Sequence, residues 1–128
     1  TWDAAMQACP EGWHVPTNSE YTTLYNAIGD AKTAGTYLKS ISGWFNNYGK
    51  CTDDYGFTLL SAGYRHEQGY FNSIDSYAYL WTATEKEEAE NQAYQNNTSY
   101  FSPKMNQQTS SKSAAYSLRC LKDADTSN

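Results

Sequence analysis

Apolar residues with helical spacing occur near the start of the chain. The segment TWDAAMQAC places its apolar side chains at i, i+3, i+4 and i+7, and these are Trp2, Ala5, Met6 and Cys9. This spacing predicts a short amphipathic helix. Pro10 and Gly12 follow and are expected to end it. The next residues, GWHVP, allow a brief extended segment with Trp13 and Val15 on one side.

A second helix is predicted for the segment TNSEYTTLYNAIGD. Thr17 can cap its first turn, and Glu20, three residues later, completes the capping-box pattern. Gly29 is expected to end the helix. The side chains that share its buried face are expected to be Tyr21, Leu24, Tyr25 and Ile28.

Beyond Gly29 the helical periodicity disappears, and Gly, Asn, Asp and Ser separate short runs that are rich in aromatic residues and Leu. The runs are YGFTLLSAGYR, GYFNSI, YAYLWTAT, QAYQ, SYFS and AAYSLRCLK. Short runs between turn residues predict the strands of an antiparallel sheet. Two early helices followed by a series of strands indicate an α+β fold.

Alternation in YAYLWTAT predicts which side chains of this strand share a face. Tyr77, Tyr79 and Trp81 fall on one face, and Ala78 and Leu80 fall on the other. We expect one face to pack on helices and the other to be at least half buried. The other residues expected in the core are Trp13, Trp44, Gly63, Tyr64 and Arg65. The acidic run EKEEAE, residues 85–90, is expected to form a solvated loop after this strand.

Composition describes a folded, acidic domain that is rich in aromatic residues. The chain has 128 residues, which suits one domain with its own core, and its twelve Tyr and four Trp exclude a disordered chain. The formal charge of −5 argues against nucleic acid or an anionic membrane as a partner, since both require a basic patch. No run of 18 apolar residues occurs, so we expect no direct membrane insertion by this segment.

The three cysteines, Cys9, Cys51 and Cys120, form no CxxC pair and have no zinc-ligand spacing with histidine. One disulfide plus a free thiol would suit an exported protein, and three buried thiols a cytosolic one; the residues alone leave both open. Asp53 and Asp54 in CTDDYG are expected in a turn, since calcium needs six to eight oxygen ligands. We expect neither a metal nor a cofactor.

Residue patterns that would indicate catalysis are weak. His14 and His66 lie in a short extended segment and in a turn, and no G-x-S-x-G nucleophile motif occurs. Glu20, Glu85 and Asp75 could supply a carboxylate pair, but helix capping already accounts for Glu20. We therefore expect a protein that is not an enzyme.

Several motifs in a fixed order resemble one protein family. They are TWDAAM, CPEGWHVPTNSEY, GFTLLSAGYR, YLWTATE and YSLRCLKD, and together they extend over nearly the entire chain. In these motifs the chain is similar to the Fibrobacter succinogenes major paralogous domain, a group of bacterial exported and lipoprotein-borne domains. The resemblance implies a C-type-lectin-like fold, with two N-terminal helices, a small twisted, mainly antiparallel sheet and long irregular loops.

Further expectations follow from this resemblance alone. It implies a disulfide between Cys9 and Cys120 and a location at the bacterial cell surface or in the medium, with the export signal elsewhere in the protein. From the residues themselves, a single domain is expected over residues 1–123, with a flexible tail at 124–128. Compared with the family, the first strand is missing. Without that strand, a sheet edge is left open or the C-terminal strand pairs differently. Cys51 then has no partner and is either a buried small hydrophobe or the site of an intermolecular bridge.

The segment 91–116 has an unusual composition. Eighteen of its twenty-six residues are Asn, Gln, Ser, Thr or Tyr, and it has no carboxylate, although the six residues before it include four. The implied fold needs the strand that follows, so the segment is not a linker. It is either a solvated sheet face or a surface for binding. A solvated face is normally rich in Lys and Glu, whereas Tyr, Ser and Asn are typical of antibody binding loops.

The composition of this segment favours a contact surface, which the implied fold would place on an exposed face. We expect a non-enzymatic, surface-displayed binding domain whose ligand is an unidentified protein or glycan. The alternative is a structural component of a cell-surface or filament assembly, whose polar face packs on another subunit. The residues expected to contact the ligand are Tyr94, Asn96, Asn97, Ser99, Tyr100, Asn106 and Tyr116.

The resemblance also implies a possible source for this composition. Lectin-like domains of this kind serve as the variable proteins of diversity-generating retroelements, which mutate adenines near the end of a gene. Asn codons begin with two adenines, and changing them yields Tyr, Ser, Asp, Thr and Gly. Under this hypothesis, residues 91–116 would be a diversified binding surface.

Overall fold

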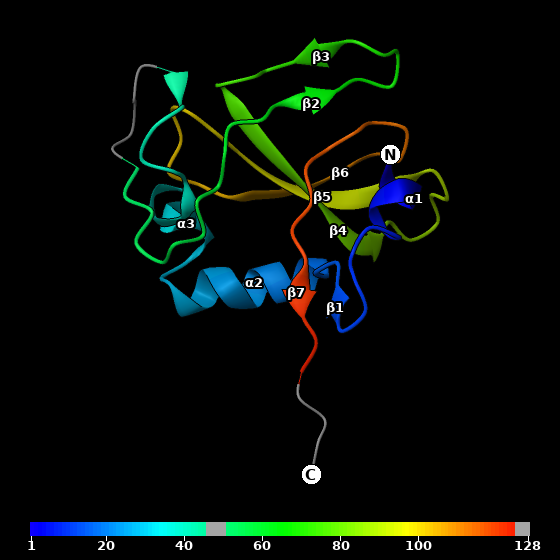
Figure 1. Cartoon of the computed structure of the whole chain (residues 1–128), viewed down its shortest axis with the longest axis horizontal. Helices are drawn as coiled ribbons and strands as arrows, with labels where there is room; N and C mark the ends of the chain where they lie inside the picture. Colours follow the sequence, from blue (N-terminus) through cyan, green and yellow to red (C-terminus); the bar gives the residue numbers. More distant parts are fainter. Residues whose placement is uncertain (46–50, 125–128) are drawn as a thin grey trace.

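The structure is a computed structural model that describes residues 1–45 and 51–124. Within this range the chain is α+β, as predicted, and Figure 1 shows α2 and the β2–β3 hairpin on opposite sides of the central strands. All of the helices that the structure describes are too short and too polar to cross a membrane. Of the predicted tail, residues 125–128 lie outside the described range. The elements are α1 (Trp2–Ala5), β1 (Trp13–His14), α2 (Asn18–Ala27), α3 (Ala31–Leu38), β2 (Tyr64–Arg65), β3 (Phe71–Asn72), β4 (Tyr77–Glu85), β5 (Gln92–Ser99), β6 (Asn106–Ser111) and β7 (Leu121–Lys122).

Helices form at both predicted places, and their starts follow the capping residues in the sequence. The first is shorter than predicted, since α1 ends at Ala5 and residues 6–8 form turns before Pro10. The Thr1 side chain accepts a hydrogen bond from the Ala4 N–H at the start of α1. At the start of α2, the Glu20 N–H donates to the Thr17 hydroxyl oxygen and the Thr17 N–H donates to the Glu20 carboxylate, which is the predicted capping box. Each bond satisfies an N–H group that the helix itself leaves without a partner.

The prediction of only two helices is wrong, because the described residues contain a third helix, α3. Asp30 caps it by accepting a hydrogen bond from the Lys32 N–H. Glycine lowers the helix propensity of a segment, and Gly35 in the middle of α3 obscured the helical pattern. Its small size has a packing reason, since a Cβ atom at position 35 would lie 2.8 Å from the Pro103 carbonyl oxygen.

The central sheet is antiparallel, with the order β4-β5-β6. The structure joins QAYQ with the following residues into one strand, β5, and adds the polar strand β6, which the aromatic runs did not predict. Trp81 lies opposite Gln95, which in turn lies opposite Gln108. On the other edge of β4, the Trp81 N–H donates to the Ser117 carbonyl oxygen at 3.1 Å, so residues near Ser117 extend the sheet.

Two small antiparallel pairs complete the fold: β1 with β7, and β2 with β3. Next to the first pair lies the disulfide between Cys9 and Cys120, which confirms the pairing that the resemblance implied. The two cysteines are 111 residues apart in the sequence. Closing so long a loop restricts the unfolded chain and is worth roughly 4 to 5 kcal/mol in the chain-entropy model.

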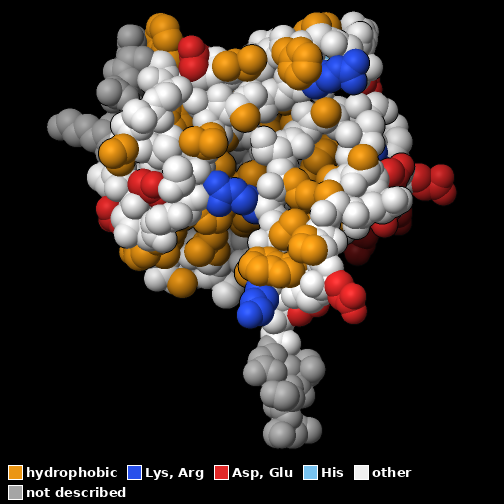
Figure 2. Space-filling model, viewed as in Figure 1, with side chains coloured by type: hydrophobic (Ala, Val, Ile, Leu, Met, Phe, Trp, Pro, Cys, Tyr) orange, Lys and Arg blue, Asp and Glu red, His pale blue; other side chains and the backbone are white. Residues whose placement is uncertain are grey.

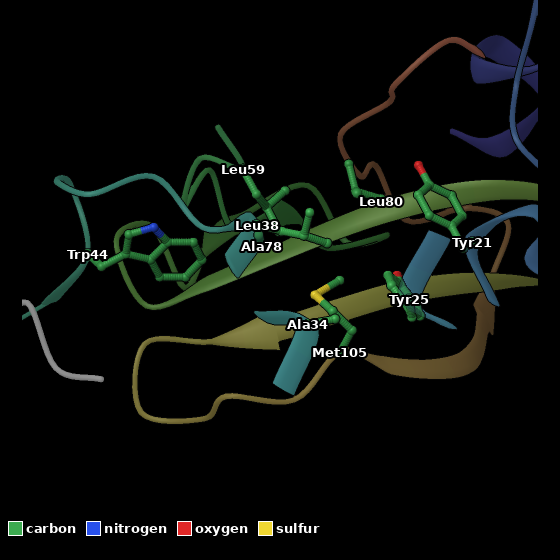
Figure 3. Packing of buried hydrophobic residues seen from close by; sticks show 9 residues of the cluster. All are labelled: Tyr21, Tyr25, Ala34, Leu38, Trp44, Leu59, Ala78, Leu80 and Met105. Carbon is green, nitrogen blue, oxygen red and sulfur yellow. The ribbon is translucent and has the colours of Figure 1, made fainter. Parts of the chain in front are cut away.

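The core consists of two clusters of buried hydrophobic residues. The larger cluster, shown in Figure 3, lies between the helices and one face of the sheet and comprises Tyr21, Tyr25, Ala34, Leu38, Trp44, Leu59, Ala78, Leu80 and Met105. The smaller cluster comprises Trp2, Ala5, Trp81, Ala93 and Ala114. The predicted alternation of β4 is therefore confirmed, because Ala78 and Leu80 pack toward the helices while Tyr77 and Tyr79 are half-buried.

Two residues that were predicted to lie in the core are exposed. Trp13 is 44% exposed, because β1 is only two residues long and pairs with β7 at the margin of the molecule. Arg65 is also exposed, and its Nε donates to the Gly69 carbonyl oxygen within the β2–β3 hairpin. Trp44 and Trp81 are buried, as predicted.

Candidate functional site

A cavity of about 370 Å³ opens between the β2–β3 hairpin, one face of the central sheet and the chain around Tyr116. This face is the one directed away from α2, and we call the space the tyrosine–amide cavity. The residues that define its chemistry are Tyr64, Tyr79, Tyr116, Gln95, Gln108 and Ser110. A cavity of this size falls within the usual range for small-molecule sites, about 300 to 1,000 Å³.

Tyrosine rings form one wall of the cavity. The rings of Tyr79 and Tyr116 are nearly parallel, with their centroids 4.9 Å apart. The Tyr64 and Tyr79 rings form an edge-to-face pair whose centroids are 5.1 Å apart. Tyr116 also rests on the buried Trp81, with centroids 4.5 Å apart. Aromatic pairs at these separations contribute beyond their buried area, so the wall is held firmly in place.

The backbone of the sheet explains why these side chains meet. Tyr79 and Trp81 share a face of β4 through strand alternation, and Gln95 lies opposite Trp81 on β5. The Ser117 N–H donates to the Tyr79 carbonyl oxygen at 3.1 Å, which fixes the chain next to β4 and sets Tyr116 beside Tyr79. Residues that lie directly opposite on adjacent strands project to the same side, so Gln108 joins Gln95 on this face.

Side-chain amides form a hydrogen-bonded network on the same face. Asn97 Nδ2 donates to Gln95 Oε1 at 2.9 Å and to Gln108 Oε1 at 3.0 Å. Asn106 Nδ2 donates to Asn97 Oδ1 at 3.3 Å. Within the described residues Gln108 Nε2 has no hydrogen-bond partner, so its donors remain available.

Hydroxyl groups extend this network to the tyrosine wall. Gln95 Nε2 donates to Ser110 Oγ at 3.2 Å, and Tyr116 Oη donates to the same oxygen at 2.9 Å. Burial raises the pKa of Tyr79 to about 12 and also raises the pKa of Tyr116. Both phenols therefore stay protonated at neutral pH and can act as hydrogen-bond donors.

The rim of the cavity contains the groups that can carry charge. Glu67 is exposed, and its Oε2 accepts a hydrogen bond from Ser111 Oγ at 3.1 Å. His66 is half-buried and stacks on Tyr70, with ring centroids 4.6 Å apart. The described residues that line the cavity include no Lys or Arg, so the site has no fixed positive charge.

Of the residues predicted to contact a ligand, Tyr116 lies in the cavity, and Asn97 and Asn106 support it through the amide network. Tyr94 instead lines a separate cavity of about 310 Å³, together with Glu85 and Lys86. The structure therefore does not bring all of the predicted contact residues together.

The prediction that Asn96, Asn97 and Ser99 are exposed is wrong, because all three are buried. Asn96 is 0% exposed and lies on the helix-facing side of the sheet, where it accepts a hydrogen bond from Tyr25 Oη. The Ser99 carbonyl accepts a hydrogen bond at 2.7 Å from the buried Lys39 Nζ. These polar residues of β5 were predicted on an exposed face because polar composition alone does not distinguish buried, hydrogen-bonded side chains from exposed ones.

Tyr100 is a half-buried aromatic residue that packs against the larger core cluster. Its ring makes edge-to-face contacts with the rings of Phe45 and Phe101, and in each pair the ring centroids are 5.2 Å apart. It lies outside the tyrosine–amide cavity.

Five of the six residues that define the chemistry of the cavity were not predicted as ligand contacts: Tyr64, Tyr79, Gln95, Gln108 and Ser110. Tyr64 was assigned to the core, whereas Tyr79 was assigned to one face of the predicted strand, and an expected half-buried face of β4 was the signal that could have identified Tyr79. Gln95 lay in the predicted run QAYQ but carried no signal for binding, and Gln108 and Ser110 had none because β6 does not have the aromatic pattern of the other strands.

Other residues considered for chemistry have structural roles. Asp53 accepts hydrogen bonds from the Thr58 N–H and hydroxyl, each at 2.7 Å, as expected for a turn. Cys51 is half-buried and packs against the larger core cluster. No group of three or more His, Cys, Asp or Glu side chains suited to a metal ion is found in residues 1–45 and 51–124.

Comparison with known proteins gives one match. The model of the Fibrobacter succinogenes major domain matches residues 1–122, which is nearly the whole chain. No curated protein and no solved structure gives a significant match.

Proposed function

The chain belongs to the Fibrobacter succinogenes major domain family, and on that basis we propose that it is a non-enzymatic, surface-displayed binding domain. Its binding site is the tyrosine–amide cavity. The observation that carries this proposal is a preformed cavity in which aromatic rings and side-chain amides converge. Aromatic side chains beside well-placed polar groups are typical of ligand sites.

The hydrogen-bond inventory of the cavity supports binding. Gln95 and Asn97 are buried and hold each other in place, whereas Gln108 is exposed and has free donors on its Nε2 within the described residues. Because the buried amides hold the exposed Gln108 side chain in position, less conformational entropy is lost when a ligand is bound. This arrangement provides recognition without a large conformational change.

The titratable groups of the cavity support a non-catalytic role. General acid–base chemistry requires a group whose pKa lies near neutral pH and which contacts the reacting atoms. The Tyr79 and Tyr116 phenols have raised pKa values, and the carboxylate of Glu67 is exposed on the rim. The ring of His66 is stacked on Tyr70, and its Nδ1 accepts a hydrogen bond from the Gln68 N–H, so the chain itself occupies this nitrogen. Hydrolysis of a glycoside would in addition require a pair of facing carboxyl groups.

We further propose that the fold is C-type-lectin-like and that the domain functions outside the cytoplasm. The disulfide that joins the end of the first helical segment to the C-terminal region supports the fold, as do the small antiparallel sheet and the long irregular connections. Disulfides form and persist in oxidising compartments, which supports an extracytoplasmic location. The binding role does not require that residues 91–116 be diversified.

Screening by nuclear magnetic resonance tests the binding site. Compounds from a library of small soluble molecules should shift the side-chain amide signals of Gln95 and Gln108 and the ring signals of Tyr79 and Tyr116. Gln108→Ala should weaken these interactions about fivefold, since one hydrogen bond is worth about 1 kcal/mol. The matched control is Gln92→Ala, because Gln92 has the same side chain but does not line the cavity.

Two results would contradict the proposal. Binding that maps elsewhere and is insensitive to Gln108→Ala would assign the ligand to another surface. Concentration-dependent self-association in sedimentation experiments, abolished by Gln108→Arg, would instead support the assembly alternative. In that case the polar face would pack on a second subunit.

A further inference from the structure

We infer that the tyrosine–amide cavity binds a neutral sugar ring of a glycan, in preference to an anionic group, an amine or an extended peptide. This inference rests on the proposed function, since it names the ligand class of the same site. The argument uses the chemistry of the wall, the amide network, the charge of the lining and the position of the cavity on the sheet.

The wall has the mixed character that a sugar ring requires. A pyranose has C–H groups on its faces and hydroxyls around its edge, so it needs apolar area next to hydrogen-bonding groups. Tyr64, Tyr79 and Tyr116 provide apolar ring surface, and each ends in a hydroxyl. Because the rings pack on one another at 4.9 to 5.8 Å, their orientation is fixed before a ligand arrives.

The amides match sugar hydroxyls, which donate and accept hydrogen bonds at the same time. A glutamine amide offers an acceptor and two donors on one planar group. The bonds to Asn97 and Ser110 orient Gln95, and a bond from Asn97 fixes the oxygen of Gln108. Because Gln108 Oε1 already accepts a hydrogen bond from Asn97, the Nε2 end of the same amide is available to donate to a ligand oxygen.

The charge of the lining argues against ionic ligands. A phosphate, sulfate or carboxylate is normally bound by Arg, Lys or a helix N-terminus. Of the described residues that line the cavity, none is Lys or Arg, and Glu67 at the rim would repel an anion. The Glu67 carboxylate is exposed and already accepts a hydrogen bond from Ser111, which makes it a weak site for an amine.

The position of the cavity argues against an extended peptide. Peptides that add a strand to a sheet bind along its edge, where backbone N–H and C=O groups are unpaired. The tyrosine–amide cavity lies over the face of β4, β5 and β6, where the backbone groups of β5 already pair with both neighbours. A ligand here meets side chains, so its own hydrogen-bonding edge must be made of hydroxyls or similar groups.

The test is to measure binding of neutral methyl glycosides of common hexoses and N-acetylhexosamines to the disulfide-bonded domain, followed by an array of neutral and anionic glycans. We expect saturable shifts of the Gln95 and Gln108 amide signals with at least one neutral glycoside. Gln108→Ala and Tyr116→Phe should each weaken this binding about three- to tenfold, whereas Gln92→Ala and Tyr55→Phe should leave it within twofold. Tyr55 is exposed and does not line the cavity.

Glu67→Gln distinguishes ligand charge, since it removes the carboxylate but retains its shape. A neutral sugar should bind this variant within twofold of the original protein, whereas a tenfold loss would indicate a cationic ligand and overturn the inference. Absence of neutral glycan binding across the array would also overturn it. If another class of compound still binds at Gln108, the proposed function stands and only the ligand class is wrong. If no compound shifts the cavity signals, both fall.

Discussion

The two faces of the central sheet have similar polar side chains but use them differently. On the helix-facing side, Asn96 and Thr98 are buried among hydrogen-bond partners that the chain itself supplies. On the opposite side, Gln95 and Gln108 border a cavity that is open to solvent. In the view of Figure 2 much of the surface is uncharged, and red acidic side chains are most numerous along its right side, with others on the left. Composition therefore does not separate a structural amide from a binding one.

The partners of each amide make that distinction. Asn96 Oδ1 accepts a hydrogen bond from Tyr25 Oη at 2.6 Å, and Asn96 Nδ2 donates to Asn18 Oδ1 at 2.9 Å. Thr98 Oγ1 donates to the Lys104 carbonyl oxygen at 2.6 Å. These groups are matched within the fold, whereas the Nε2 donors of Gln108 are unmatched in the described part of the chain. Unmatched donors on an accessible face are the ones that a ligand can use.

The largest expected effect follows from Asn96→Ala. The substitution leaves the Tyr25 hydroxyl without its buried partner, removes one of the two hydrogen bonds to Asn18 Oδ1 and deletes a buried side chain, and we expect a loss of about 3 kcal/mol in the free energy of unfolding. Urea denaturation of the disulfide-bonded protein measures it. Gln108→Ala is the comparison from the other face; it removes one acceptor of the Asn97 amide, which keeps its bond to Gln95, and should cost about 1 kcal/mol. Equal losses in both variants would remove the difference between the two faces.

An intermediate effect is expected for two tyrosines of α2 that face the same core. Tyr25 and Tyr21 are 1% and 3% exposed, and Figure 3 shows both rings in the larger cluster. Tyr25→Phe removes the hydrogen bond to Asn96 and should cost about 1 to 2 kcal/mol. The Tyr21 hydroxyl is buried and has no partner in the described structure, so Tyr21→Phe should be neutral or stabilising by up to about 1 kcal/mol. Thermal unfolding of both variants checks the pair, and a loss in Tyr21→Phe would contradict it.

The smallest expected effect lies outside both faces and concerns His14. The hydrogen bond to Asp123, with Nδ1 and Oδ1 2.6 Å apart, and that to Glu20 raise the pKa of His14 above 6.5. Burial opposes ionisation of Glu20, but its bonds to the Thr17 N–H and His14 outweigh this and lower its pKa below 4.5.

A raised histidine pKa stabilises the fold below the ordinary pKa of about 6.5, and this stabilisation is lost as the pH rises through the folded value. The lowered pKa of Glu20 has the opposite pH dependence: it stabilises the fold above about pH 4.5, and this stabilisation is lost as the pH falls below that value. The difference in stability between the original protein and His14→Gln should therefore be largest near pH 5 to 6 and vanish at pH 9. Denaturation at several pH values measures it. A difference that persists at pH 9 would contradict the raised pKa of His14 as its cause. His14→Gln should leave ligand binding at the cavity unaffected.

Local signals in the sequence predicted the parts of the fold that depend on neighbouring residues. Thr17 and Glu20 predicted the start of α2 because a capping box is made within four residues. Alternation in β4 predicted which of its side chains share a face, and the structure showed that the face with Ala78 and Leu80 packs on the helices. The disulfide came from the resemblance and not from local chemistry, since Cys9 and Cys120 meet only when the chain has folded.

Other features depend on contacts between distant segments, so the tertiary structure decided them and the local sequence patterns did not predict them. Gly35 reads as a helix breaker, yet it permits the close approach of α3 to Pro103. Trp13 reads as core, yet β1 lies at a margin where no layer covers it. Asn96 and Gln95 are adjacent in an amide-rich strand, and successive side chains of a strand point to opposite faces. The sequence by itself thus determined the polar character of β5, and only the packing of helices on one face and tyrosines on the other decided which amides stabilise the fold and which border the cavity.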